Sequence, residues 1–202
     1  MLNDRPLPVV PVAAKFDVVA IGASAGGIEA LHVVVNALPA GFVVPVVIVQ
    51  HLDPRHRSLL AELLSRHSRL PVKQAADGET LRPGAVYLAA PDAHLLVRDG
   101  RLVFSDRPQV HFSRPSIDLL FASVADAYGD RALGVVLSGT GTDGADGVRA
   151  IKARGGTIIV QNPAGAAHPG MPEAARATGC ADHVLPLEAI APALVELAGG
   201  GV

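Results

Sequence analysis

A serine, a histidine and an aspartate each come directly after an apolar run of this 202-residue sequence. Ser24 lies in "IGASAGG", His51 follows "VVIVQ", and Asp143 lies in "GTGTDGADG" after "GVVLS". A serine hydroxyl attacks a carbonyl at neutral pH only when a base accepts its proton, and a carboxylate usually orients that base. These residue types are the parts of a nucleophilic catalyst, with Ser24 as nucleophile, His51 as base and Asp143 as acidic partner.

Glycine-rich segments surround two of these residues. Gly22, Gly26 and Gly27 flank Ser24 and allow a sharp turn from strand to helix without Cβ clashes. Backbone N–H groups at the start of the following helix lack intrahelical partners and can stabilise an oxyanion. The second segment, residues 139–147, is a further source of such a donor. Both segments fit acyl-transfer chemistry, and they fit tight turns equally well.

Simpler structural roles compete with catalysis at these positions. Ser24 and Asp143 are preferred residue types for a helix N-cap, and Asp146 competes with Asp143 as the acidic partner. "GASAG" also matches the G-x-S-x-G elbow of α/β-hydrolases, whose order of serine, acid and histidine would make His168 or His183 the base. That elbow follows several strands, whereas here it follows the first predicted strand, so we favour His51.

A nucleotide-binding turn is another interpretation of "IGASAGG". The segment does not keep the G-x-G-x-x-G spacing, and Gln50-His51 stands where a ribose-binding acidic residue would be needed. We therefore expect no cofactor. The sequence has no H-E-x-x-H or comparable ligand spacing, and Cys180 is its only cysteine, so we expect no metal site. His111, in the loop before a predicted helix, is a candidate to face a substrate.

Alternating strands and helices are needed to position these residues. The pattern predicts an α/β fold: a doubly wound, mostly parallel sheet with helices on both faces, a Rossmann-like three-layer sandwich, plus a short β-hairpin. Sites in such sheets gather beyond the carboxyl ends of the strands. The predicted strands are 17–22, 42–49, 85–90, 132–138, 157–160 and 182–185, the hairpin is 94–105, and the helices are 26–38, 57–67, 115–128, 187–198 and one that ends at Arg154.

Composition limits the class of protein. The chain is 50% hydrophobic with a formal net charge of −2, which suits one domain with a good core and argues against a nucleic-acid partner. The span from Glu29 to Asp53 lacks charged residues, but Asn36, Pro39 and Pro45 interrupt it, so we expect no membrane insertion. Residues 1–15 are predicted to be a short lead-in without a signal peptide, and residues 16–198 the catalytic domain of a cytoplasmic protein.

Six segments together resemble one known family. "IGASAGG", "VVIVQHLDP", "AVYLAAPDAHLLV", "RPSIDLLFASVADAYG", "VVLSGTGTDGADGVRAIKARGGTIIVQNP" and "GMPEAA" are similar to the catalytic domain of the chemotaxis protein-glutamate methylesterase (CheB-type) family. The resemblance spans about residues 16–197, with the segments in the family's order and spacing. It implies a serine hydrolase that removes methyl esters from glutamates on chemoreceptor cytoplasmic helices, and that in many members also deamidates receptor glutamines.

The resemblance also implies roles for individual residues. The family's catalytic serine, histidine and aspartate fall on Ser24, His51 and Asp143, and backbone N–H groups at Ala25 and Thr140 correspond to its oxyanion and substrate-binding donors. Many members carry threonine at position 25 and methionine at position 140, so substrate preference is less secure than reaction type. The family's usual N-terminal receiver domain is not expected here, which leaves regulation to a receiver supplied in trans or to another device.

The remaining alternative among hydrolases is a serine esterase of the same fold that acts on a different ester. For a glutamate-rich receptor helix, the esterase should present positive charge near its active site. Two groups of cationic residues fit this expectation. The first follows His51 and contains only two acidic residues, Asp53 and Glu62; the second precedes the helix predicted from Pro115. The first group is Arg55, Arg57, Arg66, Arg69 and Lys73, and the second is Arg107 and Arg114.

Overall fold

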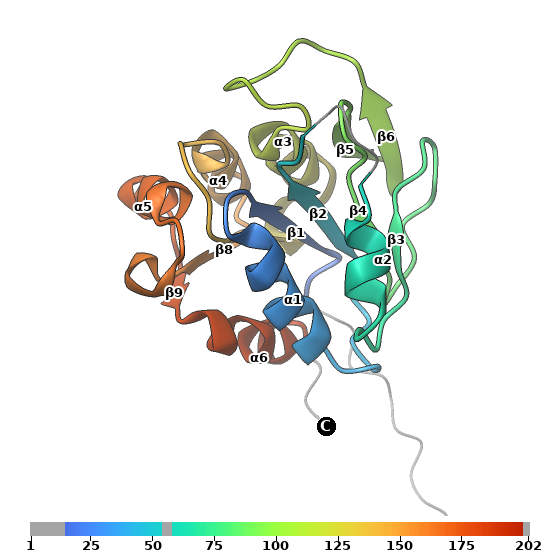
Figure 1. The fold of residues 1–202 in the computed structure, drawn as a ribbon, viewed down its shortest axis with the longest axis horizontal. Helices are drawn as coiled ribbons and strands as arrows, with labels where there is room; N and C mark the ends of the chain where they lie inside the picture. Colours follow the sequence, from blue (N-terminus) through green and yellow to red (C-terminus); the bar gives the residue numbers. More distant parts are fainter. Residues whose placement is uncertain (1–14, 54–57, 200–202) are drawn as a thin grey trace, which may run out of the picture.

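A computed structural model describes residues 15–53 and 58–199 of the chain. A seven-stranded sheet lies at its centre, with strand order β3-β4-β2-β1-β7-β8-β9 (Figure 1). Every pairing in this sheet is parallel. The strands are β1 (Val18–Ala23), β2 (Val46–Gln50), β3 (Val72–Gln74), β4 (Val86–Leu88), β7 (Ala132–Val136), β8 (Thr157–Gln161) and β9 (His183–Leu185). The predicted doubly wound parallel sheet is confirmed.

Helices cover both faces of the sheet, as predicted (Figure 1). One core cluster joins one sheet face to three helices: α1 (Gly27–Ala37), α2 (Leu60–Ser65) and α6 (Leu187–Leu197). The other cluster joins the opposite face to α3 (Ile117–Tyr128), α4 (Ala145–Ala153), α5 (Gly170–Ala177) and the antiparallel hairpin of β5 (His94–Arg98) and β6 (Arg101–Ser105). Short 3₁₀ turns occupy Gly129–Arg131 and Pro163–Gly165.

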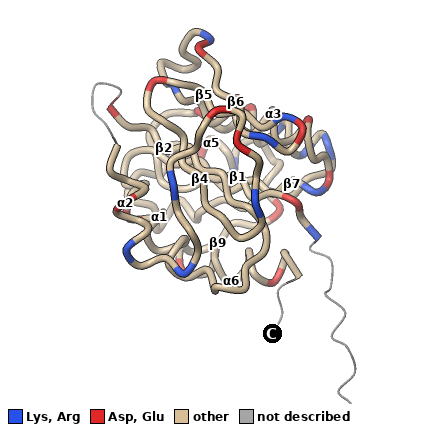
Figure 2. The backbone as a smooth tube through the Cα atoms, turned by 90° about the vertical axis from the view of Figure 1, so that its right-hand side faces the viewer, with Lys and Arg blue, Asp and Glu red and all other residues tan. Residues whose placement is uncertain are grey.

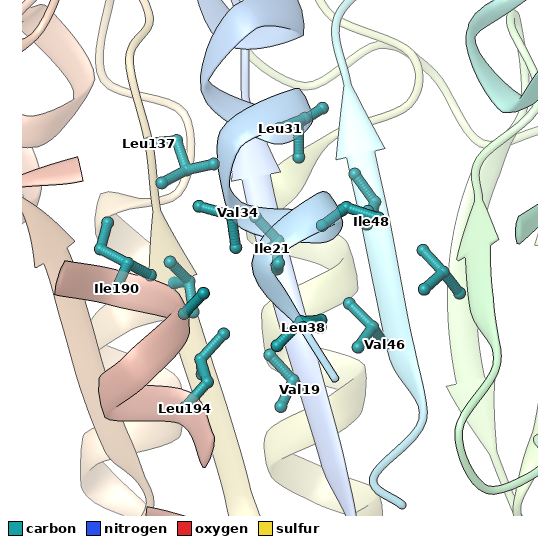
Figure 3. Close-up of a cluster of buried hydrophobic side chains, with 14 of the residues drawn as sticks. Val19, Ile21, Leu31, Val34, Leu38, Val46, Ile48, Leu137, Ile190 and Leu194 are labelled. Carbon is teal, nitrogen blue, oxygen red and sulfur yellow. The ribbon is translucent and has the colours of Figure 1, made fainter. Parts of the chain in front are cut away.

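Alternation along the central strands explains why both faces are apolar. Val19 and Ile21 of β1 point into the α1 and α6 side, where Leu31, Val34 and Leu194 pack against them (Figure 3). Val18 and Ala20 of the same strand belong to the opposite cluster. A strand buried on both faces must be apolar throughout, which is why the continuous run "VVAI" predicted β1 correctly.

Several element boundaries differ from the prediction. The predicted strand 42–49 begins only at Val46, because Pro45 has no N–H to donate and Phe42 is in a turn bonded to Pro39. The helix predicted from Pro115 begins at Ile117 and is capped by Ser116, whose hydroxyl accepts the Leu119 N–H.

Strand β3 and helix α5 were not predicted, and helix α2 is shorter than predicted. The three residues of β3 are too few for a periodicity to be read. α5 contains Pro172 in its first turn, where proline is tolerated. The helix predicted at 57–67 is observed as Leu60–Ser65, and residue 57 lies outside the described residues.

The order of the strands creates the place for a site. The chain runs from β1 to β2 on one side and later returns to β7 on the other side of β1. The carboxyl ends of β1 and β7 therefore flank a topological switch point, where α/β folds bind ligands. Ser24 follows β1, His51 follows β2 in the neighbouring position, and the segment from Leu137 to Gly144 follows β7. Across residues 15–53 and 58–199, no helix has the length and hydropathy of a membrane span.

Candidate active site

Ser24, His51 and Asp143 form a continuous hydrogen-bonded chain. Ser24 Oγ lies 3.2 Å from His51 Nδ1, and His51 Nε2 lies 2.9 Å from Asp143 Oδ2. Asp143 is buried, whereas Ser24 and His51 are partly exposed. The three candidates chosen from the sequence thus meet in space, although His51 and Asp143 are 92 positions apart.

The competing interpretations of these residues do not agree with the geometry. The N-cap of α1 is Gly26 and that of α4 is Gly144, so neither Ser24 nor Asp143 caps the helix that follows it. Asp146 is exposed and pairs with Arg149 at 2.6 Å, whereas the carboxylate bonded to His51 is that of Asp143. His183 is an exposed residue of β9 at the edge of the sheet.

The turn at Ser24 is fixed by its backbone. Ser24 N–H donates to Ser138 O at 2.9 Å, and Ser24 O accepts from Gly27 N–H. Gly26 has a φ of 69°, which favours glycine. At Gly139 a Cβ would lie 2.9 Å from the Ser24 Cβ and 2.1 Å from Met171 Sδ. The second glycine-rich segment can therefore approach the serine closely only because residue 139 is glycine.

Gln50 was not singled out from the sequence as a site residue, yet it joins the serine and histidine turns. Its amide Nε2 donates to Ser24 O at 2.8 Å and to His51 O at 2.9 Å. The side chain is 6% exposed. Gln50 therefore joins the two loops that carry Ser24 and His51.

Asp143 lies at the amino end of α3 and receives several hydrogen bonds there. Its Oδ2 accepts from Ile117 N–H at 2.8 Å, and its Oδ1 accepts from Asp118 N–H and from the Ser116 hydroxyl, each at 3.0 Å. A helix amino terminus favours a negative charge. Burial acts to raise the pKa of Asp143, but the His51 hydrogen bond and these N–H donors outweigh it and lower the pKa below its usual value.

His94 supports this arrangement from the hairpin. The residue is fully buried at the start of β5, and its Nδ1 accepts from Ser116 N–H at 3.1 Å. Its Nε2 lies 3.1 Å from Pro108 O, so Nε2 carries the proton. A chain of hydrogen bonds thus runs from His94 through Ser116 and Asp143 to His51.

Asp118 is a second buried carboxylate next to Asp143. Its Oδ1 accepts from Gly144 N–H at 2.9 Å and Gly147 N–H at 2.7 Å, so it holds the turn that follows Asp143. Burial raises the pKa of Asp118 to about 6; the Gly147 hydrogen bond acts against this rise, and the neighbouring charges of Asp143 and Asp146 add to it. The pKa of Asp118 is therefore raised and the pKa of Asp143 is lowered.

A cavity of about 520 Å³ opens over Ser24. Among the described residues, the backbone N–H groups of Ala25 and Thr140 donate to no protein acceptor. His111, expected to face a substrate, does border the cavity. The lining consists of Ser24, His51, His111, Phe112, Ser113, Thr140, Gly141, Thr142 and Asp143.

The fold and the site together define an α/β protein with a serine, histidine and aspartate chain at the switch point of a parallel sheet. Residues 19–194 match the family model described as CheB methylesterase. The chain belongs to the CheB methylesterase family.

Individual relatives agree with this assignment. The chain is 45% identical over 197 residues, 97% of its length, to protein-glutamate methylesterase/protein-glutamine glutaminase 2 of Cupriavidus metallidurans, of which it covers 57%. It is 45% identical over 199 residues to protein-glutamate methylesterase/protein-glutamine glutaminase 3 of Pseudomonas aeruginosa, covering 96% of this chain and 59% of that protein. The chain therefore spans somewhat more than half the length of these curated relatives.

A solved structure has the same fold. The crystal structure of the Thermotoga maritima CheB methylesterase catalytic domain superimposes with a TM-score of 0.87 at 35% identity. The match covers 90% of this chain and 98% of that one. The predicted fold class and family resemblance are thereby confirmed.

Proposed function

We propose that this chain is a serine carboxylic ester hydrolase that removes methyl esters from glutamate side chains of chemoreceptor cytoplasmic helices. The observation that carries the proposal is the hydrogen-bonded chain Ser24–His51–Asp143 in a member of the CheB methylesterase family. The names of the relatives, which combine methylesterase and glutaminase, support glutamine deamidation as a second reaction of the same site.

The geometry supports an acyl-enzyme mechanism. His51 Nδ1 accepts the proton of Ser24 Oγ as the oxygen attacks the ester carbonyl, and ionised Asp143 stabilises the imidazolium through Nε2–H. Backbone N–H groups of Ala25 and Thr140 would bind the oxyanion of the tetrahedral intermediate. His51 then returns the proton to the departing methoxide, which leaves as methanol. Water, deprotonated by His51, attacks the acyl-serine and releases the free glutamate and Ser24.

Deamidation requires the same groups. With a glutamine side chain, the leaving group is ammonia instead of methanol, and the acyl-serine intermediate is identical. The helical, glutamate-rich substrate and a receiver domain or protein acting in trans are the partners that we propose for this site.

Methanol release from a methylated receptor fragment tests the proposal directly. We expect stoichiometric methanol from methylated fragment with the unaltered chain and none with Ser24→Ala. A fluorophosphonate probe should label the chain at Ser24. Labelling together with hydrolysis of small esters but not of the receptor fragment would identify an esterase for another substrate. Tight NAD or ATP binding without labelling would identify a nucleotide-binding domain instead.

A further inference from the structure

A cluster of metal-ligating side chains lies beside the catalytic chain and takes no part in the proposed mechanism. His111 belongs to the loop between β6 and α3, Asp118 to the first turn of α3, and Asp146 to the first turn of α4. One ligand atom from each residue lies within 4.8 Å of the others. The spacing 111, 118 and 146 follows no sequence pattern, which is why the sequence predicted no metal site.

Asp118 has one oxygen that the protein leaves unsatisfied. Its Oδ1 holds two backbone N–H groups, whereas its Oδ2 is buried and has no hydrogen-bond partner among the described residues. The residue is 7% exposed. A buried carboxylate oxygen without a donor is costly, so this oxygen is poised to accept a proton or a cation. The group that faces it is His111 Nε2, at 3.4 Å.

The distances and ligand types fit a zinc ion. Ligands at about 2.0–2.1 Å from a tetrahedral zinc ion lie about 3.3–3.4 Å apart, close to the 3.4 Å between His111 Nε2 and Asp118 Oδ2. An imidazole favours zinc over magnesium or calcium, and carboxylates are also zinc ligands. Asp146 is 71% exposed, and among the described residues it pairs with Arg149 on its own helix, so its carboxylate can close the remaining distance to an ion at little cost.

We propose that His111, Asp118 and Asp146 bind a divalent transition-metal ion of the zinc type, with water completing the coordination. The ion would connect the loop beside the active-site cavity to α3 and α4. Phe112 and Ser113, which follow His111, line that cavity, so an occupied site would fix one wall of it. The positive charge would also offset the repulsion between Asp118 and Asp143. This inference does not depend on the proposed methylesterase activity.

Zinc binding to tag-free protein, treated with a chelator and dialysed, tests the site. We expect one equivalent of Zn²⁺ to bind with micromolar or tighter affinity in calorimetry and to raise Tm. His111→Ala and Asp146→Asn should each weaken binding at least tenfold. Asp118→Asn should also weaken zinc binding at least tenfold. Its side-chain amide oxygen can still accept the hydrogen bonds from Gly144 N–H and Gly147 N–H. A single cooperative unfolding transition for each variant in chelator would show that the fold is retained.

Matched variants distinguish this site from adventitious binding. His183 is an exposed histidine, and Asp126 is an exposed aspartate paired with Arg154 as Asp146 is with Arg149. His183→Ala and Asp126→Asn should therefore leave zinc affinity unchanged. His32 and His67 lie edge to face with ring centroids 5.5 Å apart. His32→Gln therefore tests whether zinc binds at this pair of histidines instead. Absence of binding, or binding lost in His32→Gln but retained in His111→Ala, would overturn the proposal.

Discussion

The imidazole of His51 uses its two nitrogens in the opposite sense to the chymotrypsin-type template. There Nε2 faces the serine and Nδ1 faces the aspartate, whereas here Nδ1 faces Ser24 and Nε2 faces Asp143. The chemistry is preserved, because a carboxylate that binds Nε2–H leaves the Nδ1 lone pair free to accept the serine proton. In the proposed mechanism, Asp143 therefore selects the tautomer of His51 as well as stabilising the imidazolium.

This tautomer argument predicts an order among the catalytic variants. Ser24→Ala or His51→Ala should reduce kcat on the order of 10⁶-fold, and Asp143→Ala or Asp143→Asn roughly 10⁴-fold. In Asp143→Asn the side-chain amide can donate to His51 and hold the proton on the wrong nitrogen. Methanol release under single-turnover conditions gives these rates. Loss of turnover in His168→Ala or His183→Ala but not in His51→Ala would contradict the assignment.

Gln50 permits a second test at a position that touches no reacting atom. In Gln50→Glu, a carboxylate oxygen replaces the amide nitrogen that donates to Ser24 O and His51 O, so attraction becomes repulsion. We expect kcat to fall at least tenfold with little change in KM, because the loops carrying nucleophile and base separate. Gln50→His, whose ring N–H can donate, should recover part of the loss. A fall in kcat that only matches a loss of folded protein, seen as a lowered Tm, would instead indicate general unfolding.

At the scale of elements, the amino end of α3 supports the acidic half of the site. Its cap Ser116 and its first two N–H groups bind Asp143, and its Asp118 side chain binds the N-cap and the first turn of α4. The strand ends and the three catalytic candidates were predictable, because apolar runs show where buried strands stop. The roles of His94, Ser116 and Asp118 were not, since each depends on contacts between segments at least 22 positions apart.

Asp118 makes the stability of this junction depend on pH. Its pKa in the folded protein is about 6, above the ordinary 3.8, so the folded state binds more protons than the unfolded state between these values. Its stabilising contribution is thus complete below pH ~3.8 and is lost as the pH rises through ~6. The groups facing Asp118 are Asp143, Asp146 and His111.

Asp118→Asn isolates this contribution. We expect the free energy of unfolding of Asp118→Asn, relative to the unaltered chain, to increase with pH from about 4 to about 6.5 and then to level off. Urea unfolding at a series of pH values, with chelator present, measures the difference. The same comparison in a His111→Ala background controls for titration of the histidine. A difference that stays flat or decreases over this range would mean that Asp118 is ionised throughout.

At the scale of the whole molecule, basic and acidic residues are interleaved along the backbone (Figure 2). Arg154 pairs with Asp126 at 2.6 Å, and Arg131 with Asp17. Two cations of the expected positive surface are also paired: Lys73 lies 2.7 Å from Glu79, and Arg114 lies 2.6 Å from Asp92. Exposed pairs of this kind contribute little stability, and they reduce the long-range field that these two residues can supply.

The arginines closest to His51 in sequence, Arg55 and Arg57, lie outside the described residues, so their contribution stays a prediction. If they attract a glutamate-rich helix, the double variant Arg55→Glu/Arg57→Glu should lower kcat/KM for a methylated receptor fragment about tenfold at low salt. The dependence of kcat/KM on ionic strength should weaken or reverse. Hydrolysis of a small neutral ester should barely change, because no long-range attraction acts on it.

A control of equal net charge separates local steering from overall charge. Arg98 directly precedes the hairpin turn at Asp99 and Gly100. This turn lines a cavity together with Asp17 and Pro45, which precede β1 and β2, so it lies at the end of the sheet where the strands begin, opposite to Ser24. Arg154 follows α4 and precedes β8, at that same end. Arg98→Glu/Arg154→Glu should therefore leave kcat/KM and its salt dependence nearly unchanged. Equal losses in both double variants would show that net charge alone governs association, and losses on both substrates in Arg55→Glu/Arg57→Glu would show damage around His51.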